Sequence, residues 1–205
     1  MKVITFTDAS MEAYGCTVYI RHEYESHEVT CQLVASKSKV APHTPMTVPK
    51  LELMGAVLGL RLAQSVIVVL GIPMQDVLFY SDSIDVLWWI SGRGKEFRPF
   101  VANPVGEIHS ISDPSQCQYV STHENPADLC TRGTSPSQLS EKVLWWEGPA
   151  WIKKEEDQWP RMKFERRPYK LPERRTTRCD GGVVLAVNTQ RNESTVQPKE
   201  DETWR

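Results

Sequence analysis

Four acidic residues lie in or next to segments where a charged carboxylate is energetically unfavourable. Asp8 ends an apolar segment (VITFTDAS), and Asp82 ends a second one (VLFYSDS). Glu52 lies in the first turns of an otherwise apolar helical segment (LELMGAVLGLRLA), and Asp128 follows a proline in THENPADL. Carboxylates that converge on one place repel one another unless a cation neutralises them. The pattern therefore predicts a divalent-metal site.

Each of these acids also has a purely structural interpretation. Asp82, which precedes Ser83, could cap a helix, and Asp8 could be a turn residue. Glu52 and Asp128 could each complement the dipole at the start of a helix. The metal hypothesis depends on all four acids meeting at one edge of a sheet.

The order of predicted elements brings such a meeting about. The predicted strands are residues 2–7, 14–20, 29–35, 77–81 and 118–120, and the predicted helices are 47–70, 83–90, 103–111 and 126–131. The order β-β-β-α-β-α-α-β-α predicts an α/β fold in which a mixed five-stranded sheet carries helices on its faces. If the first and fourth strands pair, Asp8 and Asp82 become neighbours. Two Mg²⁺ ions held there, about 3.5–4 Å apart, could activate a water and stabilise the leaving oxygen of a phosphodiester.

Composition limits the class of protein. The chain has 205 residues, of which 40% are hydrophobic and 24% charged, as in a globular protein. The longest apolar stretch, 51–70, is interrupted by Glu52 and Arg61, so no membrane partner is expected. Five scattered cysteines without a CxxC motif, and an N-terminus that lacks a signal peptide, indicate an intracellular protein, cytoplasmic or nuclear and not secreted.

Three regions follow from the change in composition. Residues 1–135 are predicted to form the sheet domain, and 136–165 a connection segment rich in tryptophan and proline. Residues 166–205 are predicted to be an irregular, disordered tail, basic at first (RRPYKLPERRTTR) and then polar. The basic run is either a solvated linker or a nucleic-acid-binding tail.

Several motifs together resemble the ribonuclease H region of a BEL/Pao-type LTR retrotransposon Pol polyprotein, from about residue 3 to about residue 160. They are TDAS, ASKSKVAP, TVPKLELMGAVLGLRLA, FYSDSIDVLWWI, FRPFVANPVGEI, STHENPADLCTRGTSP and LWWEGPAWI. The resemblance implies a ribonuclease H-like fold with the same element order. It also implies an endonuclease that hydrolyses the RNA strand of an RNA–DNA hybrid and leaves 3′-hydroxyl and 5′-phosphate ends.

The resemblance assigns roles to the four acids. Asp8 would bridge two Mg²⁺ ions, with Mn²⁺ as a possible substitute, Glu52 and Asp82 would hold the ion that activates water, and Asp128 would hold the other. The hybrid would be recognised through its backbone and 2′-hydroxyls. The candidate substrate-binding residues are Ser10, Ser36, Thr47, Ser83 and Asn125. His123 is an auxiliary candidate, although it lies five residues before Asp128 where cellular ribonucleases H often have a separation of about ten.

The sequence also departs from the family pattern. Pro104, placed at the first position of the third predicted helix, would shorten or kink that helix, and SGRGKEFRP is too short to form a separate basic handle. The reverse transcriptase and integrase parts of Pol are the implied partners, and a piece without them is expected to have weak activity or none. The sequence does not indicate an oligomeric state.

Two other functions compete with this prediction. One is a domesticated ribonuclease H-like module that binds without cleaving. The other is an aspartic peptidase, because regions of Pao-type Pol have been labelled as retrotransposon peptidases. An aspartic peptidase needs paired aspartates, usually in D-[ST]-G turns, whereas this chain has D-A-S and D-S-I.

Overall fold

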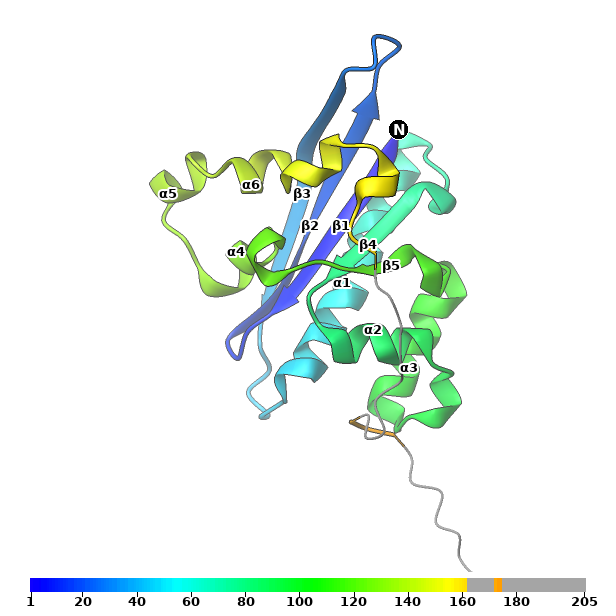
Figure 1. Cartoon of the computed structure of the whole chain (residues 1–205). Coiled ribbons are helices and arrows are strands. Elements are labelled where there is room, and N and C mark those ends of the chain that lie inside the picture. The colour runs from blue at the N-terminus through cyan, green and yellow to red at the C-terminus, as the bar shows by residue number, and fades with distance from the viewer. Residues whose placement is uncertain (162–171, 175–205) are drawn as a thin grey trace, which may run out of the picture. The chain divides into compact units, whose positions relative to one another are not determined.

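The computed structural model describes residues 1–161 and 172–174, and these include a five-stranded mixed sheet (Figure 1). The strands are β1 (Lys2–Ala9), β2 (Ala13–Glu23), β3 (Val29–Val40), β4 (Val77–Ser81) and β5 (Cys117–Tyr119). Their spatial order is β3-β2-β1-β4-β5. The first three strands pair antiparallel, while β4 and β5 are added in parallel. The predicted sheet is confirmed.

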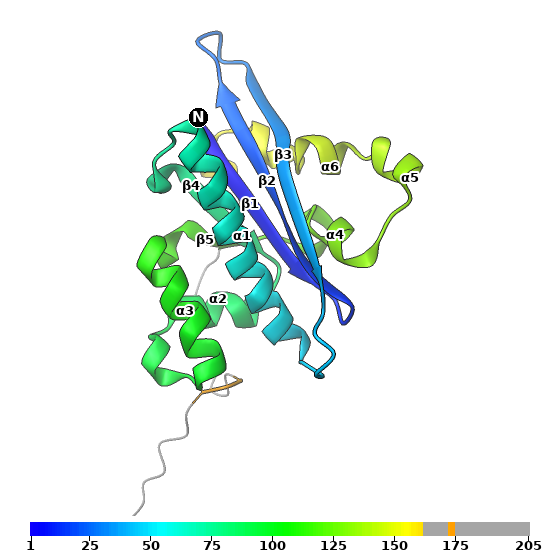
Figure 2. The same ribbon diagram turned by 180° about the vertical axis from the view of Figure 1, so that it is seen from behind.

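Helices lie on both faces of the sheet. They are α1 (Val48–Leu70), α2 (Ile84–Ser91), α3 (Pro99–Ile111), α4 (Asp128–Arg132), α5 (Pro136–Ser140) and α6 (Val143–Glu147). Figure 2 shows α1, α2 and α3 on one face, with α4 and α6 behind the sheet. The predicted order β-β-β-α-β-α-α-β-α is thus confirmed, and the two short helices α5 and α6 follow it.

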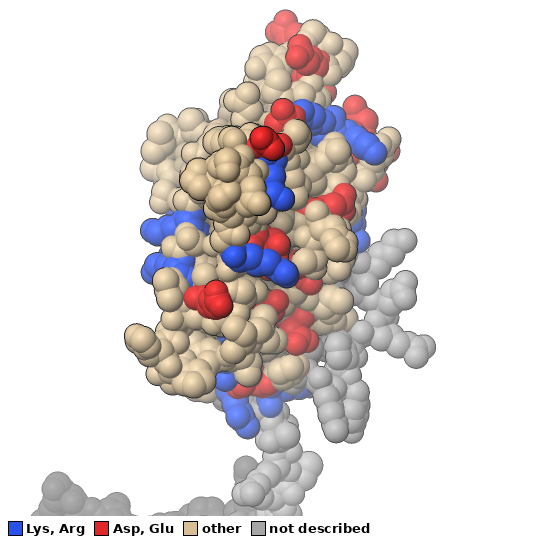
Figure 3. Space-filling model, turned by 90° about the vertical axis from the view of Figure 1, so that its left-hand side faces the viewer, with Lys and Arg blue, Asp and Glu red and all other residues tan. Residues whose placement is uncertain are grey.

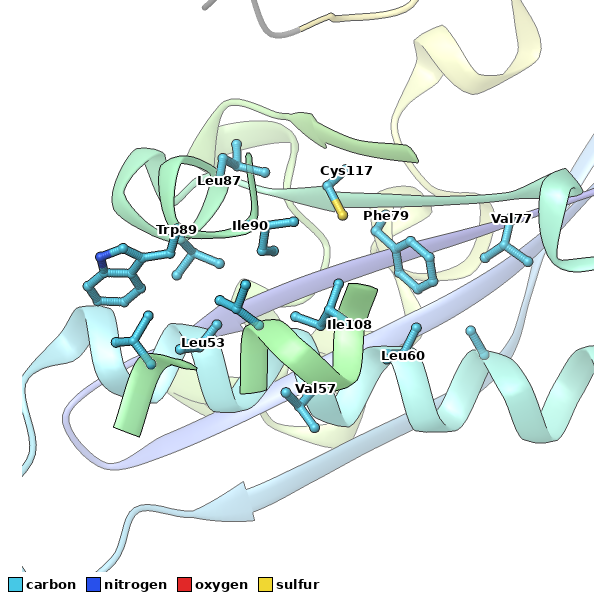
Figure 4. Packing of buried hydrophobic residues seen from close by; sticks show 14 of the residues in the cluster. Leu53, Val57, Leu60, Val77, Phe79, Leu87, Trp89, Ile90, Ile108 and Cys117 are labelled. Carbon is cyan, nitrogen blue, oxygen red and sulfur yellow. The ribbon is translucent and has the colours of Figure 1, made fainter. Parts of the chain in front are cut away.

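The larger apolar core lies between the sheet and the helices α1, α2 and α3. Figure 4 shows Leu60 of α1 near Phe79 of β4 and Leu53 of α1 near Trp89 of α2, with Ile108 of α3 between them. Trp89 of α2 is fully buried at one end of this core. Because α1 presents apolar residues to both the sheet and α3, it is held as the central helix of the domain.

The helix α1 packs unusually close to the sheet. A Cβ at Gly59 would lie 2.6 Å from the Cγ2 of Thr7, so only glycine fits there. By length and composition alone α1 could cross a membrane. Here Leu53 and Leu60 on this helix are 0% and 1% exposed because the sheet and its neighbouring helices cover them.

The tryptophan-rich segment builds a second core on the opposite face of the sheet. Trp151 packs on Tyr80 and Phe6, with ring centroids 4.9 and 6.0 Å apart. The buried Arg21 of β2 donates from Nε to the Ile152 carbonyl oxygen at 2.9 Å, and its guanidinium lies 5.6 Å from the Trp159 ring centroid. This segment is therefore part of the packing of the sheet.

The prediction for the third helix was wrong at its start. The helix α3 begins at Pro99, and Pro104 lies inside it instead of at its first position. Pro99 supplies the fixed φ of a first-turn proline, and buried Val101 and Val105 anchor the helix on both sides of Pro104. Apolar packing thus outweighs the one backbone hydrogen bond that Pro104 cannot donate.

The basic and polar tail predicted for 166–205 lies outside the described residues except for Pro172, Glu173 and Arg174. The Pro172 carbonyl oxygen accepts a hydrogen bond from Trp89 Nε1 at 2.9 Å. The Glu173 carboxylate pairs with Lys50 at 2.9 Å.

Candidate active site

Two adjacent parallel strands place Asp8 next to Asp82. Thr7 of β1 and Ser81 of β4 are the last paired residues of the two strands, and Asp8 and Asp82 are the next residues along the chain from each. The alternation of side chains puts Asp8 on the same face as Phe6, and Asp82 on the same face as Tyr80. The Phe6 and Tyr80 rings stack with centroids 5.4 Å apart, and α4 lies on this side of the sheet (Figure 1).

Glu52 reaches the same edge from the other side of the sheet. It lies one helical turn before Gly55, where a Cβ would be 3.1 Å from the Asp8 carbonyl oxygen. Glu52 Oε2 accepts a hydrogen bond of 2.5 Å from the hydroxyl of Ser83, the N-cap of α2. The start of α1 is therefore joined to the residue that follows Asp82.

Asp128 is the first residue of α4, which packs on β2 beside Asp8. Gly15 of β2 is the residue opposite Asp8, and a Cβ there would lie 2.7 Å from the Cβ of Cys130. The absence of a side chain at Gly15 thus makes room for α4. Nε of Arg132, one turn later in the same helix, forms an ion pair with Oδ1 of Asp128 at 2.6 Å.

The electrostatics show that the acids share one environment. Burial, followed by the charges of Asp82 and Asp128, raises the pKa of Asp8 from 3.8 to about 6, against the opposing hydrogen bond from Thr131. Burial raises the pKa of Glu52 from 4.5 to about 7, with further contributions from Asp82, Asp8 and Asp85 and an opposing one from Ser83. Asp82 contributes to both shifts and Asp128 to that of Asp8, so the four acids interact electrostatically.

The donor set suits a hard divalent cation, since all four acids offer oxygen ligands. Each carboxylate is turned toward its own protein partner: Thr131, Ser83, Asn125 or Arg132. Within the described residues, no three acidic, histidine or cysteine side chains are gathered closely enough to form a ready metal-ligand group. Each of these contacts engages one oxygen of its carboxylate, so the other oxygen of each acid is left for a cation.

The predicted substrate-binding residues fall into two classes. Ser36 and Thr47 are exposed, on β3 and at the start of α1. Ser10, Ser83 and Asn125 are instead engaged within the protein, where Ser10 donates to the Thr131 carbonyl oxygen at 3.0 Å. His123 lies exposed in a single turn before α4.

Comparison with known proteins gives a family match for the first part of the chain. Residues 1–83 match the model of the Pao retrotransposon-like RNaseH-like domain. The resemblance to a Pao-type ribonuclease H region is thereby confirmed, and the matched residues include Asp8, Glu52 and Asp82 while Asp128 lies beyond them.

Two solved structures are similar to this chain. One is the N-terminal RNase H domain of a Mycobacterium tuberculosis protein fused to maltose-binding protein, with 20% identity and a TM-score of 0.41 over 60% of this chain and 85% of that chain. The other is LC11-RNase H1 in complex with an RNA/DNA hybrid, with 14% identity and a TM-score of 0.42 over 60% of this chain and 88% of that chain. A comparison with curated proteins gave no match.

Sequence reasoning missed two residues of this candidate site, Thr131 and Gly15. Thr131 follows Asp128 by three positions, which in a helix places both on neighbouring parts of one face. That spacing was a usable signal for Thr131. Gly15 had no such signal, because its importance depends on the strand register that puts it opposite Asp8.

Proposed function

We propose that this chain hydrolyses the RNA strand of RNA–DNA hybrids, using two divalent cations held by Asp8, Glu52, Asp82 and Asp128. The observation that carries the proposal is the placement of Asp8 beside Asp82 at the ends of two adjacent parallel strands. Glu52 and Asp128 belong to the same group, because each interacts electrostatically with Asp8. Four acids at one edge of an RNaseH-like sheet are the arrangement that two-metal phosphodiester hydrolysis needs.

The residues divide the work by their positions. Asp8 lies at the centre of the group and is the carboxylate to share between both ions. Glu52 and Asp82, joined through Ser83, would hold the ion on one side, and Asp128 the ion on the other. Mg²⁺ or Mn²⁺ bound there would supply an activated water and stabilise the leaving oxygen.

Recognition of the hybrid would use its backbone and 2′-hydroxyls. The exposed hydroxyls of Ser36 and Thr47 are available for such contacts, and the exposed His123 could assist proton transfer. On the face shown in Figure 3, Lys and Arg side chains lie among Asp and Glu side chains. Salt-sensitive attraction from this face is therefore weak, and the parent element's reverse transcriptase and integrase parts would supply further grip on the substrate.

The test is cleavage of a hybrid whose RNA strand carries a 5′ label, in Mg²⁺ and separately in Mn²⁺. We expect labelled fragments with 3′-hydroxyl ends from the hybrid and none from the corresponding DNA duplex. Fragments that also appear from single-stranded RNA would point to a contaminating ribonuclease. A hybrid that stays intact in both metals, at low salt and with excess protein, would contradict the proposal.

One observation favours the non-catalytic alternative. Glu52 accepts a hydrogen bond from Ser83, and Asp128 pairs with Arg132 of its own helix, so both carboxylates have partners within the protein. A hybrid that binds but is not cut would support this alternative. The peptidase alternative explains less, because an aspartic dyad would use Asp8 and Asp82 and leave Glu52 and Asp128 without a role.

A further inference from the structure

The short segment before and within α4 contacts the ends of both central strands through two buried polar side chains. Asn125 is 1% exposed and Thr131 is 4% exposed. One lies just before α4 and the other within its last turn, with Asp128 between them. We call Asn125 and Thr131 the α4 clasp.

Asn125 joins the two strands that carry the aspartates. Its Nδ2 donates to the Thr7 carbonyl oxygen at 3.0 Å and to Asp82 Oδ1 at 3.3 Å. Its Oδ1 accepts from the backbone N–H of Ala127 at 3.2 Å. Because a carbonyl and an ionised carboxylate only accept, the side chain between them must donate twice, and an amide does so.

Thr131 makes the matching contact to the other aspartate. Its hydroxyl donates to Asp8 Oδ2 and also lies 3.1 Å from the Asp128 carbonyl oxygen. The Thr131 carbonyl oxygen in turn accepts from Ser10 Oγ at 3.0 Å, just beyond the end of β1. The last turn of α4 is thus fixed to the end of β1 by a side-chain and a backbone contact.

The two contacts have one consequence for the acids. The clasp holds one oxygen of Asp8 and one oxygen of Asp82, and so restricts the rotation of both carboxylates. The same residues set the position of α4, and hence of Asp128, relative to both strands. Removing one clasp contact should therefore misalign the carboxylates with one another without removing any of them.

We propose that Asn125 and Thr131 are positioning residues that align Asp8, Asp82 and Asp128 for divalent cations. This rests on the proposed metal-dependent function. Hydrogen-bond partners of metal-binding carboxylates orient them, and losing such a partner typically lowers metal affinity or activity about 10- to 100-fold.

The test compares Mn²⁺ binding by variants, measured as the rise in unfolding temperature with Mn²⁺ concentration. For each variant, the rise is measured from that variant's own unfolding temperature without metal. A general loss of stability is therefore not mistaken for a loss of Mn²⁺ affinity. We expect Thr131→Val, which keeps the shape and loses the hydroxyl, to raise the half-saturating Mn²⁺ concentration about 10-fold or more. Thr131→Ser should restore it to near the wild-type value, and Asn125→Leu should raise it like Thr131→Val.

Thr122→Val is the matched control, because Thr122 is an exposed hydroxyl in the turn before α4. It should leave the half-saturating concentration unchanged. If wild type responds to Mn²⁺ and Thr131→Val responds within twofold of it, the clasp is wrong while the proposed function stands. If wild type shows neither a Mn²⁺ response nor cleavage, the proposed function is wrong and the positioning role fails with it.

Discussion

Asp8 and Asp82 lie side by side at the ends of β1 and β4, one position beyond the paired residues Thr7 and Ser81. Asp8 is buried, with 6% of its surface exposed, so its charge is poorly screened by water. Two like charges on adjacent strands destabilise the fold in the absence of a cation. Such an arrangement makes sense where function needs both carboxylates and stability does not.

Asp82→Asn separates function from stability. We expect it to abolish hybrid cleavage, because one carboxylate ligand is lost. The free energy of unfolding without metal should stay equal or rise by on the order of 1 kcal/mol, because repulsion of Asp8 and Glu52 is relieved. Hybrid cleavage and thermal unfolding of the same preparation check both effects. Asp157→Asn, which alters an exposed carboxylate, should change neither, and persistent cleavage by Asp82→Asn would contradict the catalytic role.

Stability should depend on pH in a direction set by the raised pKa values. The pKa is raised mainly by burial, from 3.8 to about 6 for Asp8 and from 4.5 to about 7 for Glu52. At pH values between the ordinary and the raised pKa of each carboxyl, the folded state binds more protons than the unfolded chain. Stability therefore falls as the pH rises from about 4 to about 7. Urea unfolding in EDTA across this range should show the decline.

Saturating Mg²⁺ should reduce that decline, because the cation favours the ionised carboxylates and binds only the folded site. At a concentration 100 times its dissociation constant, a ligand adds about 2.7 kcal/mol to stability. The addition should be largest near pH 7 and smallest near pH 4, where protons compete for the same oxygens. An equal addition at both pH values would argue against binding at these acids.

The tryptophan-rich segment should contribute to stability through individual buried rings. Trp151 is 6% exposed against Tyr80 and Phe6, so Trp151→Ala should lower the free energy of unfolding by about 3–5 kcal/mol. Trp146 is 49% exposed, and Trp146→Ala should change it by less than about 0.5 kcal/mol. Denaturant unfolding of both variants measures the difference. Equal effects would mean that the packing of this segment on the sheet does not support the fold.

The fold was predictable because its signals are local. Apolar strands that end in Asp8 and Asp82, and a long helix bearing Gly55 and Gly59, fix the order and the close packing of the central elements. The start of α3 was missed, because a proline inside a helix is normally a stop signal and only buried neighbours show that packing overrides it. Local patterns could not predict contacts that depend on tertiary register.

The site, like the fold, could be predicted from local patterns only in part. Its acids stand out in the sequence because apolar surroundings make a carboxylate conspicuous. Asn125 was predicted to touch substrate, yet it is buried and bonded to Thr7 and Asp82. From the sequence alone, a polar residue in a loop is a candidate for substrate binding. Only the packing of α4 shows that water and substrate do not reach Asn125.

Gly15 offers the sharpest test of how α4 is placed. A Cβ at this position would lie 2.7 Å from the Cβ of Cys130, so Gly15→Ala must push α4 away from β2. We expect a loss of about 1–3 kcal/mol in stability from overpacking, together with a loss of cleavage because Asp128 moves with α4.

Gly106→Ala is the matched control, since nothing lies within 4 Å of its Cβ position in α3. That control should gain about 0.5–1 kcal/mol from helix propensity and keep wild-type cleavage. A Gly15→Ala variant with wild-type cleavage would show that the position of α4 does not limit the reaction, and that Asp128 is not required where the structure places it.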